Sequence, residues 1–273
     1  MSSTRTSAET AAERRLRHDR RAAVEHPLAA DLAAAIAAGT VEVLFQPQYG
    51  CETGGITGAE ALARWHHPDR GTVAGDELFR IAARSGLVRV LSDHVMDRAL
   101  TVACDWPKDL RLSLNITAGD LATPGFPDVV AAALCRTGFA PERLTLEITE
   151  QALVLELDRS AERLGQLVDL GIKVALDDFG AGFCNFRYLK KLPLHYLKLD
   201  RSMIEGIADD RRDLEVLRGI VALASALDLA VIAEGVETKA QRDAVVREGC
   251  ASWQGYLGAR AVPAADFAAL VAA

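Results

Sequence analysis

Residues 144–179 read LTLEITEQALVLELDRSAERLGQLVDLGIKVALDDF, and this stretch decides the fold class. Its two ends, 144–149 and 173–179, have the length and the apolar content of strands. The stretch 151–169 between them has a helical pattern. A strand, a helix and a second strand in this order predict a βαβ unit with parallel strands.

The same alternation extends over most of the chain. Strand-like runs occur at 41–49, 57–65, 111–117, 144–149, 173–179, 196–200, 230–236 and 251–256. Helical patterns occupy 90–105, 127–137, 151–169, 211–227 and 239–248. Eight strands within about 230 residues fit a closed barrel better than an open sheet. Only YGCETGGI separates the first two strands, which is too short for a helical crossover. The sequence therefore predicts an α/β fold, a modified TIM-type (β/α)8 barrel with an antiparallel first strand.

Composition narrows the class of protein. The 273 residues are 50% apolar and carry a net charge of −7, so we expect a packed core and no binding to DNA or RNA. The longest apolar runs, such as 32–38 and 227–233, are too short for membrane insertion. Five dispersed cysteines suggest neither a zinc site nor a disulfide framework, which is typical of a cytoplasmic protein. Residues 1–25 are polar and are predicted to be an N-terminal segment or linker helix, followed by the barrel over 26–273.

Each predicted strand carries a polar residue near its carboxyl end. These residues are Gln46, Glu60 with Arg64, Asn115, Glu147, Asp177, Lys198, Glu234 and Gln254. A parallel strand that is buried on both faces should be apolar on both. Because the carboxyl ends of barrel strands meet at one mouth, the polar residues predict a functional site there.

The charge of this mouth predicts bound cations. Six acidic side chains (Glu60, Glu147, Asp177, Asp178, Glu234, Glu237) and two basic ones (Arg64, Lys198) would leave a net charge of −4. Two carboxylates about 4 Å apart repel by roughly 4 kcal/mol at an effective dielectric constant near 20. Two divalent ions would cancel this charge, and oxygen ligands select hard ions such as Mg²⁺, Mn²⁺ or Ca²⁺. Paired metals of this kind serve the hydrolysis of phosphate esters.

An ordered series of motifs resembles the EAL-domain cyclic di-GMP phosphodiesterase family. The namesake motif is EALAR at 60–64. The others are FQP at 45–47, LSLNIT at 112–117, LEITE at 146–150, DDFGAGF at 177–183, LPLHYLKLD at 192–200, AEGVE at 233–237 and QGYL at 254–257. The resemblance extends from about residue 28 to the end of the chain, and its ordered motifs are far more specific than any single one.

The resemblance implies a set of metal ligands. Glu60, Asn115, Glu147 and Asp177 would hold one ion, and Asp177, Asp178 and Glu234 would hold the other. The cofactors would be two Mg²⁺ or Mn²⁺ ions. We expect Ca²⁺ to bind but to support little turnover, since its looser coordination does not fix the attacking water.

The resemblance also implies roles in catalysis. Lys198 would orient the water that the metals activate, and Glu237 would position that water or take its proton. Glu60, Asp177 and Asp178 complete the catalytic set, and the product would be linear pGpG.

Further roles concern the substrate and partners. Gln46 and Arg64 would contact the phosphate and guanine side of cyclic di-GMP, and Leu62 and Gln254 would shape its pocket. Glu150 would anchor the loop 178–185, which is linked to the dimer interface in this family. We expect a homodimer, with an upstream sensor or GGDEF domain if the chain is part of a longer protein.

The chain departs from the usual family pattern at a few positions. The loop reads DDFGAGFCNF instead of DDFGTGYSSL, so Ala181, Phe183, Cys184 and Asn185 bear on loop ordering and turnover rate. Ala83 and Ala261 replace an acidic residue and a proline. Two alternatives remain at this point: a catalytically silent EAL domain that binds cyclic di-GMP or a protein partner, and an unrelated Mg²⁺-dependent barrel enzyme of the enolase type. The complete acidic set argues against the first, and the DD and AEGVE segments argue against the second.

Overall fold

The computed structural model describes residues 28–150, 157–181 and 186–273. The predicted N-terminal segment 1–25, the start of the predicted helix 151–169 and loop residues 182–185 therefore lie outside the described residues. The chain divides into two compact units. The smaller unit comprises the residues up to Glu42 together with Arg64–Leu91, and the larger one comprises Val43–Ala63 and Ser92–Ala273.

The larger unit is built on a closed barrel of eight strands, as predicted. The strands are β1 (Val41–Gly50), β2 (Ile56–His67), β4 (Arg111–Asn115), β5 (Leu144–Thr149), β6 (Lys173–Phe179), β7 (Tyr196–Leu199), β8 (Ala230–Ala233) and β9 (Ser252–Trp253). Their spatial order is β1-β9-β8-β7-β6-β5-β4-β2, and pairing of β1 with β2 closes the ring. The strand pairs from β2 through β4, β5, β6, β7 and β8 to β9 are parallel, whereas β1 is antiparallel to β9. The first strand thus runs against the others, which confirms the prediction from the short first connection.

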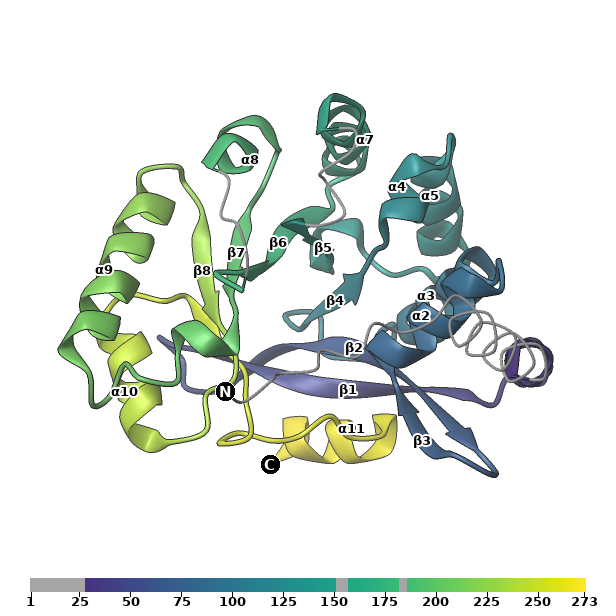
Figure 1. Ribbon diagram of the computed structural model, residues 1–273, viewed down its shortest axis with the longest axis horizontal. Coiled ribbons are helices and arrows are strands. Elements are labelled where there is room, and N and C mark those ends of the chain that lie inside the picture. The colour runs from purple at the N-terminus through teal and green to yellow at the C-terminus, as the bar shows by residue number, and fades with distance from the viewer. Residues whose placement is uncertain (1–27, 151–156, 182–185) are drawn as a thin grey trace, which may run out of the picture. The chain divides into compact units, whose positions relative to one another are not determined.

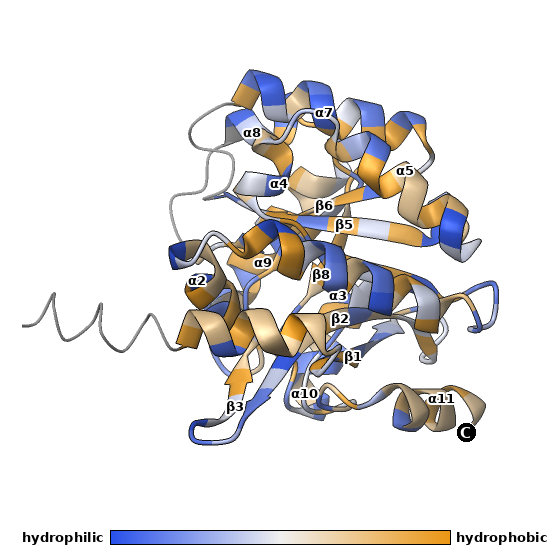
Figure 2. Ribbon diagram, turned by 90° about the vertical axis from the view of Figure 1, so that its right-hand side faces the viewer, coloured by the Kyte–Doolittle hydropathy of each residue, from blue (hydrophilic) through white to orange (hydrophobic). Residues whose placement is uncertain are grey.

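Helices cover the outside of this barrel. They are α3 (Val88–Ala103), α4 (Ala118–Ala122), α5 (Phe126–Thr137), α7 (Leu157–Asp169), α8 (Phe186–Lys191), α9 (Arg211–Ser225), α10 (Lys239–Arg247) and α11 (Ala264–Ala272), with 3₁₀ turns η1 (Pro141–Arg143) and η2 (Arg201–Met203). In Figure 1, α5, α7 and α9 lie outside the strands that precede them in sequence. Helix α7 buries Leu164 and Leu167 and shows both hydrophilic and hydrophobic residues along its length in Figure 2. This amphipathic pattern is what a helix needs to pack one face on a sheet.

An aromatic cluster covers the antiparallel strand. The Phe45 ring of β1 lies 5.1 Å from that of Trp106, and the Trp106 ring lies 4.6 Å from that of Phe267 in α11. Phe45 and Phe267 are fully buried. Burying each such ring stabilises the fold by about 1.5–3 kcal/mol. Helix α11, the last helix, therefore packs on β1 through Phe267.

The smaller unit contains elements that the sequence did not predict. A helix over residues 28–37 is followed later by β3 (Gly71–Ala74) and α2 (Gly75–Arg84). Strand β3 pairs antiparallel with the last residues of β2, from Arg64 opposite Ala74 to His67 opposite Gly71. The buried His67 contacts Asp31 at 3.3 Å. The sequence missed β3 because four residues are too few for a periodic pattern.

Several predicted strands end earlier in the structure, and after two of them a following residue caps a helical turn. The predicted strand 111–117 ends at Asn115, since the Thr117 side chain caps α4. The predicted strand 196–200 ends at Leu199, since Asp200 caps η2. The predicted strand 230–236 ends at Ala233, and 251–256 shrinks to Ser252–Trp253. Among the described residues, no helix combines the length and apolar character that a membrane span would need.

Candidate active site

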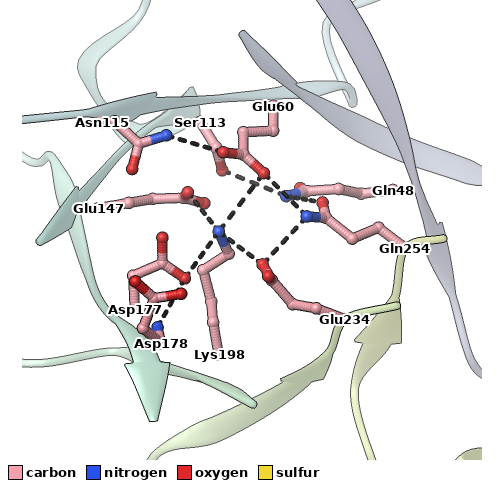
Figure 3. A network of polar contacts seen from close by, with 10 residues as sticks. All are labelled: Gln48, Glu60, Ser113, Asn115, Glu147, Asp177, Asp178, Lys198, Glu234 and Gln254. Carbon is pink, nitrogen blue, oxygen red and sulfur yellow. Dashed lines mark hydrogen bonds and ion pairs between the residues drawn. The ribbon is translucent and has the colours of Figure 1, made fainter. Parts of the chain in front are cut away.

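The larger unit gathers carboxylates around one lysine. Lys198 of β7 is fully buried, and Figure 3 shows its ammonium group at the centre of acidic side chains from separate strands. Its Nζ lies 2.5 Å from Glu147 Oε2, 2.7 Å from Glu234 Oε1, 3.1 Å from Asp177 Oδ1 and 3.5 Å from Glu60 Oε2. The contacts come from β5, the end of β8, β6 and β2.

Strand register explains why these side chains meet. Asn115 at the end of β4 lies directly opposite Glu147 of β5, and Glu60 of β2 lies opposite Ser113 of β4. Alternate residues of a strand share a face, so Ser113 and Asn115 point to the same side. The polar residues of neighbouring strands therefore project into the same end of the barrel, as the sequence pattern predicted.

Side-chain amides donate hydrogen bonds to two of the carboxylates. Asn115 Nδ2 donates to Glu60 Oε1 at 2.7 Å. Gln254 Nε2 donates to Glu60 Oε2 at 2.8 Å and to Glu234 Oε1 at 3.0 Å. Although burial alone would raise the pKa of Glu60, Lys198 and these amides lower it overall, so Glu60 stays ionised.

Glu147 and Glu234 have too little positive charge around them to stay ionised as readily. Burial raises the pKa of Glu147 well above its usual range, and the neighbouring carboxylates oppose the lowering by Lys198. Burial, together with Asp177 and Glu60, raises the pKa of Glu234 to about 8 despite Lys198. Burial would lower the pKa of Lys198, but the four carboxylates raise it well above its usual value. The lysine is therefore a permanent cation among carboxylates that it does not neutralise.

The donor set fits additional hard cations. Within the described ranges, no three Asp, Glu, His or Cys side chains are already arranged around a metal position. The Lys198 ammonium takes the central place among the acidic groups instead. However, Glu147 is 0% exposed, and its Oε1 has no hydrogen-bond partner. A buried carboxylate oxygen without a partner is costly, and oxygen donors in excess over one ammonium suit Mg²⁺ or Mn²⁺.

A bulge shapes the pair of adjacent aspartates. The pairing of β6 with β7 shifts register between Leu176 and Phe179. Asp178 has a φ of +56°, and its backbone N–H donates to Asp177 Oδ1 at 3.0 Å. Bulges and positive φ at a residue other than glycine cost energy and often occur at active sites. Here they break the strand alternation, so Asp178 lies beside Asp177 in Figure 3.

Gly180 completes this turn. Its φ is +102°, and a Cβ added there would lie 2.5 Å from Met203 Cγ. Both the backbone conformation and the close approach of Met203 therefore require glycine after the aspartate pair.

Other predicted site residues make none of the contacts with Lys198 described above. Glu237 is exposed, and its Oε1 pairs with Arg201 Nη1 at 3.0 Å. Gln46 and Leu62 are half-buried on β1 and β2, and Glu150 is half-buried just after β5. Arg64 is half-buried within the smaller unit. The structure contributes two residues that the sequence reasoning missed: Gln48 and Ser113, both buried and hydrogen-bonded in the network. Their signal was present, because they alternate with Gln46 and Asn115.

Comparison with known proteins identifies the family. The profile of the EAL domain matches residues 29–261. The chain belongs to the EAL domain family. It is 36% identical over 246 residues to the bifunctional diguanylate cyclase/cyclic di-GMP phosphodiesterase MucR of Pseudomonas aeruginosa. The matched region covers 89% of this chain and 36% of that protein. It is also 36% identical over 249 residues to the cyclic di-GMP phosphodiesterase NbdA of the same organism, covering 90% of this chain and 32% of that protein.

A solved EAL structure supports the same assignment. The MucR phosphodiesterase in complex with c-di-GMP superimposes with a TM-score of 0.81 and 36% sequence identity, over 87% of this chain and 98% of that one. This EAL chain spans only about a third of the length of the curated relatives that it matches.

Proposed function

We propose that this EAL chain hydrolyses cyclic di-GMP to linear pGpG with the help of two divalent cations. One observation carries the proposal: four carboxylates from different strands surround a buried lysine and exceed its charge. Relatives with the same domain are named as cyclic di-GMP phosphodiesterases, and one is solved in complex with that dinucleotide. EAL phosphodiesterases generally depend on divalent metal ions.

The metal ligands that we propose are two overlapping groups. The first is Glu60, Asn115, Glu147 and Asp177, and the second is Asp177, Asp178 and Glu234. When bound, the ions supply Lewis-acid chemistry that activates water and stabilises the charge of the phosphate. The excess of acidic groups and the unpartnered Glu147 Oε1 support this assignment.

The charge state of Lys198 decides its role. Its raised pKa keeps it protonated at neutral pH, so it donates hydrogen bonds and does not act as a base. Lys198 would orient the attacking water and stabilise negative charge that develops on the phosphate. A proton acceptor must then come from elsewhere. Glu237 is our candidate, since it follows β8 on the stretch that carries Glu234 and is exposed beside Arg201.

Four side chains are proposed to contact the substrate or to shape its pocket. Gln46, Leu62 and Arg64 are assigned to the substrate by family resemblance. Gln254 is assigned to the pocket as well, and its amide is engaged by Glu60 and Glu234. A cytoplasmic location, a homodimer and the anchoring role of Glu150 are proposals of the same kind.

The decisive experiment incubates the purified chain with cyclic di-GMP and Mn²⁺ or Mg²⁺ and separates the products by chromatography. We expect pGpG with either ion and none in excess chelator. Glu60→Ala is expected to abolish the product, whereas Gln166→Ala, on the exposed face of α7, should not change the rate. Binding of cyclic di-GMP without hydrolysis at saturating metal would instead establish a silent, signal-binding EAL domain.

A further inference from the structure

Gln48 is a buried amide on the antiparallel strand. It is 5% exposed on β1, and its Nε2 lies 3.2 Å from Gln254 Oε1 and 3.5 Å from Ser113 Oγ. None of the family motifs assigned a role to this residue. A buried amide in the barrel must satisfy its donors, so its contacts constrain its neighbours.

The partner Gln254 has a single orientation compatible with its surroundings. Its Nε2 carries two hydrogens and donates them to Glu60 Oε2 and Glu234 Oε1, which are both carboxylate oxygens. A flipped amide would place its carbonyl oxygen against these two carboxylates and its NH₂ against that of Gln48. The donor from Gln48 and the two acceptors therefore select the same orientation, as Figure 3 shows.

This bridge spans a gap in the barrel. Strands β9 and β1 lie between β8 and β2 in the ring, so Glu234 and Glu60 are not on neighbouring strands. Strand pairing alone does not fix the separation of their carboxylates. Gln254 follows β9 and joins them directly, and Gln48 of β1 supports Gln254 from the other side.

We propose that Gln48 is a positioning residue, which holds the Gln254 amide in the orientation that joins Glu60 to Glu234. The consequence for turnover rests on the proposed function, whereas the consequence for Gln254 does not. Replacing a residue that orients metal ligands without contacting the metal itself typically changes metal affinity or activity by about 10–100-fold.

Two substitutions separate the donor from the shape of the side chain. Gln48→Met keeps a similar length and removes the donor. Gln48→Glu adds a carboxylate that faces the Gln254 carbonyl and strengthens the repulsion within the site. The matched control is Gln166→Glu, the same amide-to-carboxylate change on the exposed face of α7.

The first measurement follows the side-chain amide of Gln254 by NMR in metal-free protein. Its signals are assigned by their loss in Gln254→Met. We expect Gln48→Met and Gln48→Glu to shift or broaden these signals, while Gln166→Glu leaves them in place. Unchanged Gln254 signals in a folded Gln48→Met protein would overturn the proposal.

The second measurement is Mn²⁺ affinity by titration calorimetry, with pGpG formation alongside it. Gln48→Met should weaken Mn²⁺ binding about tenfold, and Gln48→Glu should change it at least as much. In the Gln254→Met background, Gln48→Met should change Mn²⁺ affinity by less than a further twofold, because the Gln254 amide that Gln48 orients is no longer present. Additive effects in the double variant would show that Gln48 acts by another route. If the wild-type chain forms no pGpG, the proposed function fails, but the amide signals still test the role of Gln48.

Discussion

At the scale of single residues, the site depends on the balance between Lys198 and its carboxylates. One buried ammonium within 3.5 Å of four carboxylates is an incomplete neutralisation. Glu147 and Glu234 respond with raised pKa values, and Glu60 stays ionised because amides and Lys198 stabilise its charge. The same excess of negative charge would favour cations and would destabilise the site in their absence.

Removing the lysine should abolish turnover. We expect Lys198→Ala to lower the rate of pGpG formation at least about 100-fold, since loss of one such donor to a developing charge has this effect. The rate is measured by chromatography at saturating Mn²⁺. Lys173→Ala is the control, because Lys173 begins β6 at the other end of the barrel. Full activity of Lys198→Ala would show that its assigned role is wrong.

The raised pKa of Glu234 predicts a pH-dependent stability of the metal-free chain. In the unfolded chain this carboxyl loses its proton near pH 4.5, but in the folded chain it does so near pH 8. The folded state therefore holds more protons between these values, and the free energy of unfolding falls as the pH rises through that window. Urea unfolding in chelator should show lower stability at pH 8.5 than at pH 6.

The control for this effect is Glu234→Gln, which carries no titrating group at that position. Its stability should depend less steeply on pH than that of the wild type, although Glu147 still contributes in the same direction. Equal slopes for the two proteins would contradict the assigned pKa of Glu234.

At the scale of elements, the bulge in β6 is the feature that regular strand geometry does not supply. Regular alternation would send Asp177 and Asp178 to opposite faces. The register shift and the positive φ of Asp178 place the second aspartate beside the first. This arrangement lowers the local stability of the strand, because the positive φ is an unfavourable conformation for aspartate.

Asp178→Gly tests whether the backbone of Asp178 is strained and whether its carboxylate is needed for hydrolysis. Glycine adopts a positive φ without strain, so we expect the free energy of unfolding to rise by about 0.5–1 kcal/mol while hydrolysis is lost. Asp228 has the same φ of +56° and precedes β8 at its amino end, which makes Asp228→Gly a matched control. That variant should gain similar stability and keep full activity. Chemical denaturation and the chromatographic assay are run on both, and retained hydrolysis in Asp178→Gly would remove Asp178 from the site.

At the scale of the whole molecule, the proposed ligands come from strands that are far apart in sequence. Glu60 and Glu234 lie on β2 and at the end of β8, and the intervening strands supply the others. A cation held by such ligands binds only when these segments are folded together, so binding and folding are linked.

Divalent cations should therefore raise the thermal unfolding temperature. At 100 times its dissociation constant, an ion that binds only the folded state adds about 2.7 kcal/mol. We expect Mg²⁺, Mn²⁺ and Ca²⁺ all to stabilise the chain, but Ca²⁺ to support little hydrolysis because its coordination is looser. Differential scanning fluorimetry and the product assay measure the two effects. Rapid hydrolysis in Ca²⁺ alone would refute the second expectation.

Much of the architecture was determined by sequence periodicity. Strands 144–149 and 173–179 are found at the predicted residues, because strong apolar patterns lie between clear helix signals. The short connection after the first strand determined its antiparallel direction. The polar residues at the strand ends also predicted that Glu60, Glu147, Asp177 and Glu234 lie close together, since barrel geometry brings the ends of parallel strands to one mouth, but Glu237 lies outside this group.

Tertiary structure alone decided the contacts between these residues. The sequence showed Lys198 as one charge among several, but only the closed barrel places its ammonium at the centre of four carboxylates. The contact from Gln48 through Gln254 to Glu60 and Glu234 joins residues up to 206 positions apart in the chain. Local sequence determines which face of a strand a side chain occupies. Which side chains it contacts across the barrel depends on strand order and register, and these arise only when the whole ring closes.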